Sequence, residues 1–149
     1  MYIRNMVEAD VTAVQCLEQQ TLSPWSLLSI REELNQKLGE MFVAEVEVGS
    51  DFTPEIVGWC STRLIAPEAE LLKIAVDQYS RRAGIATALL SHLTRFLSQR
   101  SIELLFLEVR SQNHSALSFY IKSGFLQIGV RAGYYSNPSD SALIYQKIL

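Results

Sequence analysis

The stretch of the sequence that carries most chemical information is a joint between an apolar strand and a helix at residues 76–87. Small side chains in this joint let a ligand approach the backbone, and the first N–H groups of a helix lack acceptors within it. The helix dipole and two arginines add positive potential at the same place, so the joint predicts a binding site for a pyrophosphate-like anion. The residues concerned are Arg81, Arg82, Ala83, Gly84, Ile85, Ala86 and Thr87.

Two other phosphate-binding patterns do not fit this joint. A Walker loop requires Gly-Lys-Ser/Thr, which does not follow, and a dinucleotide fingerprint requires three glycines where only Gly84 is present. A purely structural interpretation remains open from the joint alone. It would then be a turn of small residues that carries a pair of surface arginines.

The histidines and cysteines give no pattern for nucleophilic or metal chemistry. His92 and His114 each lack an orienting carboxylate or a second ligand at suitable spacing, so we expect surface or packing roles. Cys16 and Cys60 lie far apart without a CxxC motif, which predicts neither a disulfide nor a zinc site. We expect both cysteines to be small buried residues, and no metal cofactor.

The elements that position these residues follow from the periodicity of apolar side chains. The order of strands and helices over residues 69–130 predicts an α/β fold with a mixed sheet, and residues 49–54 predict a hairpin turn. The run at 104–109 is typical of a strand buried on both faces. The expected strands cover residues 2–6, 41–48, 56–64, 69–76, 104–109, 125–130 and 142–149. The expected helices are one capped by Asp10, one capped by Ser26 and ended by Gly39, one from Ile85 to about Arg100, and one over 115–122 ended by Gly124.

Length and composition indicate one globular domain. The chain has 149 residues, of which 48% are hydrophobic and 19% charged, values that argue against disorder. Its apolar stretches are shorter than the roughly 20 residues that cross a bilayer, and its start shows no export signal, so we expect a cytosolic protein without membrane contact. A net charge of -3 disfavours a nucleic-acid surface and suits a basic partner better.

The joint also resembles a known family motif. Arg81-x-x-Gly84-x-Ala86 is similar to the Arg/Gln-x-x-Gly-x-Gly/Ala acetyl-CoA loop of the GNAT acetyltransferases, and the element order is similar from end to end. The resemblance implies a single GNAT domain over residues 1–149, with the acyl-CoA N-acyltransferase fold of about seven strands and about four helices. Ala86, where a glycine is common, and the long turn at 49–54 depart from the family pattern. One branch, the ribosomal-protein-alanine N-acetyltransferases (RimI type), is matched by segments 24–26, 74–77, 107–113, 116–125 and 134–135.

The resemblance implies two catalytic residues. Glu108 would accept a proton through water, and Tyr120 would protonate the departing thiolate, which a phenol of pKa about 10 can do at neutral pH. From the residues alone, Glu108 is also explained as a strand-end carboxylate paired with a basic neighbour such as Arg110, and Tyr120 as a core tyrosine. Glu68 and Glu70 are alternative bases.

The resemblance further implies how the two substrates are held. Acetyl-CoA, the expected cosubstrate, would lie on residues 81–87 and along the main chain of residues 74–76, with one N–H facing the thioester oxygen. Outside residues 81–87, the coenzyme contacts that the resemblance implies are Ile74, Ala75, Val76 and Asn113. Asn113 can equally be a helix cap. The two tyrosines at residues 134–135 are expected in a loop that closes over the acceptor, although packing within the protein would explain these aromatic residues too. The acceptor contacts implied are Trp25, Tyr134 and Tyr135.

The sequence is compatible with three functions. The first is transfer of an acetyl group to the N-terminal amine of a protein, by resemblance the N-terminal alanine of a small-subunit ribosomal protein. The second keeps the fold and coenzyme but acetylates a lysine or a small amine. The third is a module that senses acetyl-CoA without turnover.

Overall fold

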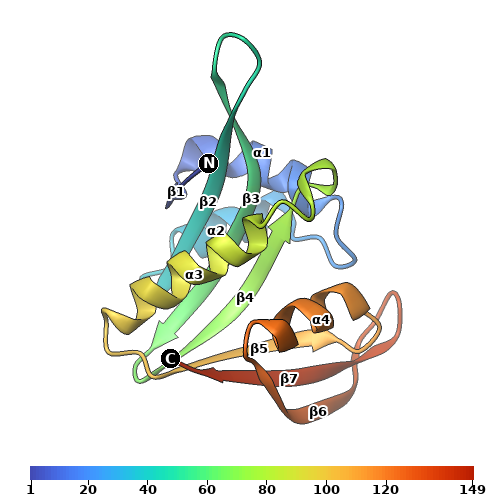
Figure 1. Cartoon of the computed structure of the whole chain (residues 1–149). Coiled ribbons are helices and arrows are strands. Elements are labelled where there is room, and N and C mark those ends of the chain that lie inside the picture. The colour runs from blue at the N-terminus through green and yellow to red at the C-terminus, as the bar shows by residue number, and fades with distance from the viewer.

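The computed structural model describes residues 1–149 and contains a seven-stranded mixed sheet of order β1-β2-β3-β4-β5-β7-β6 (Figure 1). Only β4 and β5 pair in parallel, so the predicted α/β class with a mixed sheet is confirmed. The strands are β1 (Tyr2–Asn5), β2 (Gly39–Val48), β3 (Thr53–Ile65), β4 (Glu68–Val76), β5 (Leu104–Arg110), β6 (Leu126–Tyr135) and β7 (Asp140–Ile148). The helices are α1 (Val11–Glu18), α2 (Leu27–Leu34), α3 (Ile85–Ser98) and α4 (His114–Lys122), with short 3-10 turns η1 (Glu8–Asp10) and η2 (Gln78–Ser80).

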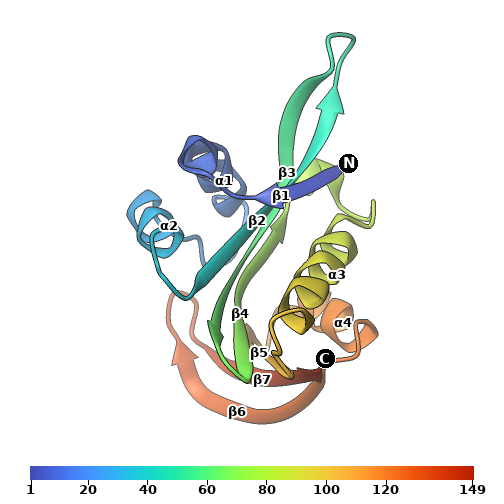
Figure 2. The same ribbon diagram turned by 90° about the vertical axis from the view of Figure 1, so that its left-hand side faces the viewer.

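The helices cover both faces of the sheet. Figure 2 shows α1 and α2 on one face and α3 and α4 on the other, while the β2–β3 hairpin extends beyond the sheet. Neighbouring residues Trp59 and Cys60 of β3 are both fully buried but belong to different apolar clusters, because successive side chains of a strand point to opposite faces. The sheet therefore separates two cores. No helix is long and apolar enough to span a membrane.

The end of α2 differs from the prediction. The helix starts as expected, with the Ser26 hydroxyl accepting from the N–H of Ser29 at 3.1 Å, but it ends at Leu34. The Asn35 side chain donates to the carbonyl of Arg31 at 2.9 Å and closes the last turn there. Gly39 instead opens β2, where a side chain would approach the carbonyl oxygen of Glu33 to 3.0 Å. The glycine thus permits close packing of β2 on α2.

Cys16 is exposed on α1, so its prediction as a buried residue is wrong, whereas Cys60 is buried as expected. The helix turns its apolar side, with Val14 and Leu17, to the sheet. A residue two positions from Val14 lies about 200° away around a helix of 3.6 residues per turn. Cys16 therefore faces solvent.

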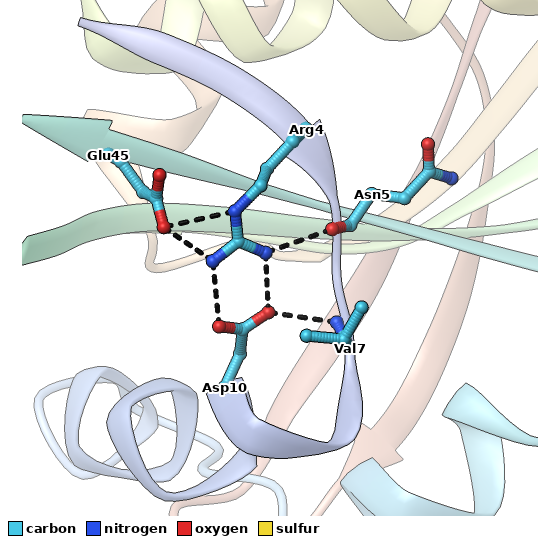
Figure 3. A network of polar contacts seen from close by, with 5 residues as sticks. All are labelled: Arg4, Asn5, Val7, Asp10 and Glu45. Carbon is cyan, nitrogen blue, oxygen red and sulfur yellow. Dashed lines mark hydrogen bonds and ion pairs between the residues drawn. The ribbon is translucent and has the colours of Figure 1, made fainter. Parts of the chain in front are cut away.

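Asp10 stands at the start of α1 but its side chain does not cap that helix. The carboxylate accepts two hydrogen bonds from the Arg4 guanidinium, at 2.7 and 2.8 Å, and one from the N–H of Val7 at 2.8 Å (Figure 3). Glu45 of β2 contacts the same guanidinium. The hydrogen bonds from Arg4 lower the pKa of Asp10, so this carboxylate fixes the connection between β1 and α1 in its charged form.

Replacing Asp10 with asparagine is expected to lower the free energy of unfolding by about 1–3 kcal/mol at pH 7, because the charge of a partly buried, hydrogen-bonded ion pair is lost. A depressed carboxyl pKa stabilises the fold above the ordinary pKa near 4 and loses this contribution as pH falls through the folded-state value. Urea unfolding at pH 7 and pH 3 should therefore show a difference between variant and wild type that shrinks at the lower pH. A constant difference would contradict the proposed charge effect.

Candidate active site

The site begins where two parallel strands separate. β4 and β5 pair only between residues 68–70 and residues 104–106, and Figure 1 shows them diverging beyond this point. A cleft of about 860 Å³ opens between them, lined by the segment after α1, β4, the start of α3, the end of β5, α4 and the end of β6. The edge of β4 that faces β5 is unpaired over residues 71–76. Its main chain can therefore pair with an extended, amide-bearing ligand.

The predicted anion loop lies at one end of this cleft. Arg82 and Gly84 adopt positive φ values of 64° and 78°, which turn the chain sharply into α3. None of the backbone N–H groups of residues 81–87 donates to another backbone group. Every residue of this loop except Ala83 lines the cleft. The free donors, the helix end and the arginines thus converge on one open space, as a diphosphate requires.

Glu108 lies on β5 at the junction of two cavities. It lines the cleft and also a second, open cavity of about 410 Å³, which is lined by residues of β3, β4, β5, β6 and β7. Its carboxylate pairs with Arg131 of β6 at 2.9 Å, so its basic partner is Arg131 and not Arg110. The alternative bases Glu68 and Glu70 line only the second cavity. Partial burial and the charge of Glu108 raise the pKa of Glu70.

The strand that carries Glu108 is buried less completely than predicted. Leu105 and Leu107 are fully buried, but the alternate residues Leu104, Phe106 and Glu108 are only partly so. Phe106 and Glu108 border the open second cavity on their face of the sheet. This opening leaves the carboxylate accessible from both cavities.

Tyr120 lies on α4 and faces the cleft from the side opposite β4. It is 8% exposed, packs against Phe119 and Phe125, and lines the cleft. Burial raises the pKa of the Tyr120 phenol well above its usual value, with a smaller contribution from Tyr135. The group is therefore protonated throughout the neutral range and can serve as a proton donor.

Asn113 and Ile74, Ala75 and Val76 also line the cleft. The Asn113 side chain accepts from the N–H of Ala116 at 3.3 Å, so its predicted role as the cap of α4 is confirmed. Its place at the cleft wall leaves room for a ligand contact as well. A β-bulge at Leu72 interrupts the pairing of β4 with β3, between Leu71 and Lys73. Bulges are common next to active sites, where they re-aim a side chain or end strand pairing.

The three predicted acceptor contacts divide into two groups. Trp25 and Tyr135 line the cleft, and Trp25 packs edge-on against Trp59 at 5.5 Å between ring centroids. Tyr134 does not line it, is 53% exposed and lies under the guanidinium of Arg131. The prediction of a loop at these tyrosines is wrong, because both belong to β6, which after an irregularity beyond Arg131 pairs with β7 again at Tyr135 opposite Asp140.

Sequence reasoning missed several polar residues of the cleft wall, among them Ser23, Lys73 and Arg110. Lys73 interrupts an apolar strand and Arg110 ends one. A charged residue within an apolar strand indicates that its charged group has polar partners inside the protein. Both histidines lie outside the cleft. His92 packs against Phe42 and burial lowers its pKa, while His114 is exposed. No group of three or more His, Cys, Asp or Glu side chains is arranged to hold a metal ion.

Known proteins with a similar sequence and fold are acetyltransferases. A family model described as the acetyltransferase (GNAT) family matches residues 11–125. The ribosomal protein bS18-alanine N-acetyltransferase of Haemophilus ducreyi is 31% identical over 140 residues, which are 93% of this chain and 92% of that protein. The crystal structure of the ribosomal-protein-S18-alanine N-acetyltransferase from Escherichia coli is similar with a TM-score of 0.85 and 27% identity, covering 99% and 92% of the two chains. Arabidopsis thaliana NAA60 in complex with acetyl-CoA shares the fold with a TM-score of 0.89 at 14% identity, covering 99% and 98%.

Proposed function

Since the chain belongs to the acetyltransferase (GNAT) family, we propose that it transfers the acetyl group of acetyl-CoA to the N-terminal amine of a protein. The predicted family and fold are confirmed, and the protein is an acetyl-CoA-dependent N-acetyltransferase. What we propose is the identity of the acceptor and of the catalytic residues. The natural acceptor we infer is the N-terminal alanine of a small-subunit ribosomal protein.

The observation that carries the proposal is the convergence of four features on one cleft. The anion loop, the open edge of β4, Glu108 and Tyr120 all border the same space between β4 and β5. Residues 81–87 would hold the diphosphate of the coenzyme, and the main chain of residues 74–76 would pair with its pantetheine amides. The sulfur end then lies toward Glu108 and Tyr120.

Acetyl-CoA supplies an activated thioester, and the side chains of this protein manage two protons. A bond forms between the acceptor nitrogen and the acyl carbon while the bond from that carbon to sulfur breaks. Glu108 takes the proton of the amine through water, and Tyr120 gives its proton to the sulfur. About a tenth of N-terminal amines are neutral at pH 7, so positioning and electrostatics provide most of the acceleration.

The choice of an N-terminal acceptor rests on relatives and on charge. Two of the relatives described above, those from Haemophilus ducreyi and Escherichia coli, are named for acetylation of the alanine of ribosomal protein S18. Glu68 and Glu70 form no ion pair within the protein and border the second cavity, next to Glu108. Basic residues that follow the acetylated residue of an acceptor would be attracted to these two carboxylates.

A peptide panel tests this function. Purified protein is incubated with acetyl-CoA and peptides that vary in the first residue, with and without internal lysines, and the acetyl group is located by mass. Acetyl on the N-terminal amine of alanine peptides supports the proposal. Transfer to lysine side chains instead would establish the second function, and tight coenzyme binding without transfer to any amine would establish a sensor.

The coenzyme loop gives a separate prediction. Replacing Gly84 with valine is expected to raise the Kd for CoA about tenfold, or roughly 1.4 kcal/mol, since a β-branched residue resists the φ of +78° that aims the N–H groups. Calorimetric titration measures the change. Gly133 also has a positive φ and open space for a side chain, but lies outside the cleft, so Gly133→Val is the matched control. Equal Kd values for the two variants would contradict the proposed loop.

A further inference from the structure

Arg110 is a buried cation that the reaction described above does not use. It is the last residue of β5, is 6% exposed and lines the cleft. Its guanidinium forms no ion pair with a carboxylate. A buried charge without a counter-ion is costly unless hydrogen bonds satisfy it, so its neutral partners are the reason it is tolerated there.

Those partners come from two separate segments of the chain. The guanidinium donates to the hydroxyl of Ser23, at 2.9 Å, in the segment of residues 19–26 between α1 and α2. It also donates to the carbonyl oxygens of Pro138, at 2.7 Å, and Ser136, at 3.3 Å, in the turn between β6 and β7. The planar fork of donors suits several fixed oxygens, which a lysine cannot reproduce. Arg110 thus ties the two segments together.

The segment that holds Ser23 is itself anchored to β4. Glu18, which is fully buried, accepts from the N–H of Trp25 at 2.8 Å and pairs with Lys73 at 3.2 Å. Lys73 in turn donates to the carbonyl oxygen of Ser23 at 2.8 Å. Segment 19–26 is therefore a fixed support, and through Arg110 it fixes the β6–β7 turn as well.

The end of β6, directly before this turn, forms one wall of the cleft. The Tyr135 ring lies 4.3 Å from the guanidinium carbon of Arg110 and faces the same cleft as Trp25. Asp140, at the other end of the turn, accepts from the N–H of Gln112 at 3.0 Å and from the Ser111 hydroxyl. The coenzyme loop at residues 81–87 takes part in none of these bonds.

We propose that Arg110 is a positioning residue for the acceptor, holding the walls formed by Trp25 and Tyr135 at the spacing that an N-terminal amine and its first residues require. The inference rests on the proposed function, since it assigns the acceptor to this side of the cleft. It concerns the acceptor alone. Coenzyme binding, which we place on the loop and on β4, does not depend on Arg110.

The test compares Arg110→Lys and Ser23→Ala with wild type in steady-state kinetics on an alanine peptide. Arg110→Lys is expected to raise the KM for the peptide about tenfold, and Ser23→Ala to raise it less, because one of the bonds is lost. The KM and the calorimetric Kd for acetyl-CoA should stay within about twofold of wild type, a change below roughly 0.5 kcal/mol. Arg100→Lys, in the turn that follows α3 and outside the cleft, is the control.

Amide hydrogen exchange supplies a readout that needs no turnover. In Arg110→Lys, exchange should accelerate at the hydrogen-bonded amides that flank the turn, those of Gln112, Gly133 and Ser141, while residues 85–98 stay protected as in wild type. An unchanged peptide KM in both variants, a parallel rise of both KM values, or unchanged exchange at the amides that flank the turn would each overturn the inference. Absence of transfer by the wild-type protein would refute the proposed function instead, and the exchange measurement would still decide the role of Arg110.

Discussion

Replacing Tyr120 with phenylalanine is expected to lower kcat by about 10²–10⁴-fold while the Kd for acetyl-CoA stays close to that of wild type. The proposed mechanism requires a proton for the departing sulfur, and Tyr120 is the buried hydroxyl that faces the cleft from α4. Removing one oxygen atom leaves the packing against Phe119 and Phe125 in place. The loss should therefore appear in turnover and not in coenzyme binding or stability.

The pH dependence sharpens this expectation. Burial raises the pKa of Tyr120, so its phenol keeps its proton to higher pH than a free tyrosine with a pKa near 10. The ratio of wild-type to variant kcat should consequently remain constant from about pH 6.5 to 9.5, without a descending limb from this group.

A second buried tyrosine provides the control. Tyr145 of β7 is 5% exposed and lies outside the cleft, so Tyr145→Phe should leave kcat within about twofold of wild type, a change too small for a lost proton donor. Comparable losses in both tyrosine variants would mean that packing and not proton transfer explains the effect. A full wild-type rate in Tyr120→Phe would remove this residue from the mechanism.

Local patterns predicted the parts of the molecule that depend on local structure. The joint at residues 81–87 combines small side chains with a helix start, and both properties can be read from neighbouring residues. The same holds for Ser26 and Asn113, whose side chains cap helices through N–H groups three residues further on. The expected roles of Glu108 and Tyr120 came from family resemblance, and they remain predictions.

Contacts between distant segments were not predictable in this way. The partners of Arg110 lie 87, 28 and 26 residues away along the chain, so no local pattern contains them. Asp10 was expected to cap α1, but Arg4 and Val7 take its carboxylate. Tyr134 and Tyr135 were expected in a loop because the polar residues that follow suggest one, whereas both belong to β6, which pairs with β7 at Tyr135. In each case a tertiary contact outweighs a local preference.

Replacing Glu108 with glutamine is expected to separate the two classes of acceptor. At pH 7 about a tenth of N-terminal amines are neutral, but only roughly one lysine amine in 2,500 is, given pKa values near 8 and 10.4. The variant should therefore lose about tenfold in transfer to an N-terminal amine and about 10²–10³-fold in transfer to lysine, if the base acts mainly by neutralising the acceptor. Rates on two peptides that differ only in which amine is free measure both losses.

The position of Glu108 at the junction of the two cavities makes the experiment specific to one carboxylate. Glu70→Gln changes a neighbouring acid that borders only the second cavity, so the same pair of peptides shows which group takes the proton. Raising the pH to 9 supplies neutral N-terminal amine without a base and should restore most of the N-terminal rate of Glu108→Gln. A loss that persists at pH 9 would mean that Glu108, paired with Arg131, shapes the acceptor site and does not accept the proton. A larger loss in Glu70→Gln would transfer the role of base to Glu70, whose pKa is raised by burial and by the charge of Glu108.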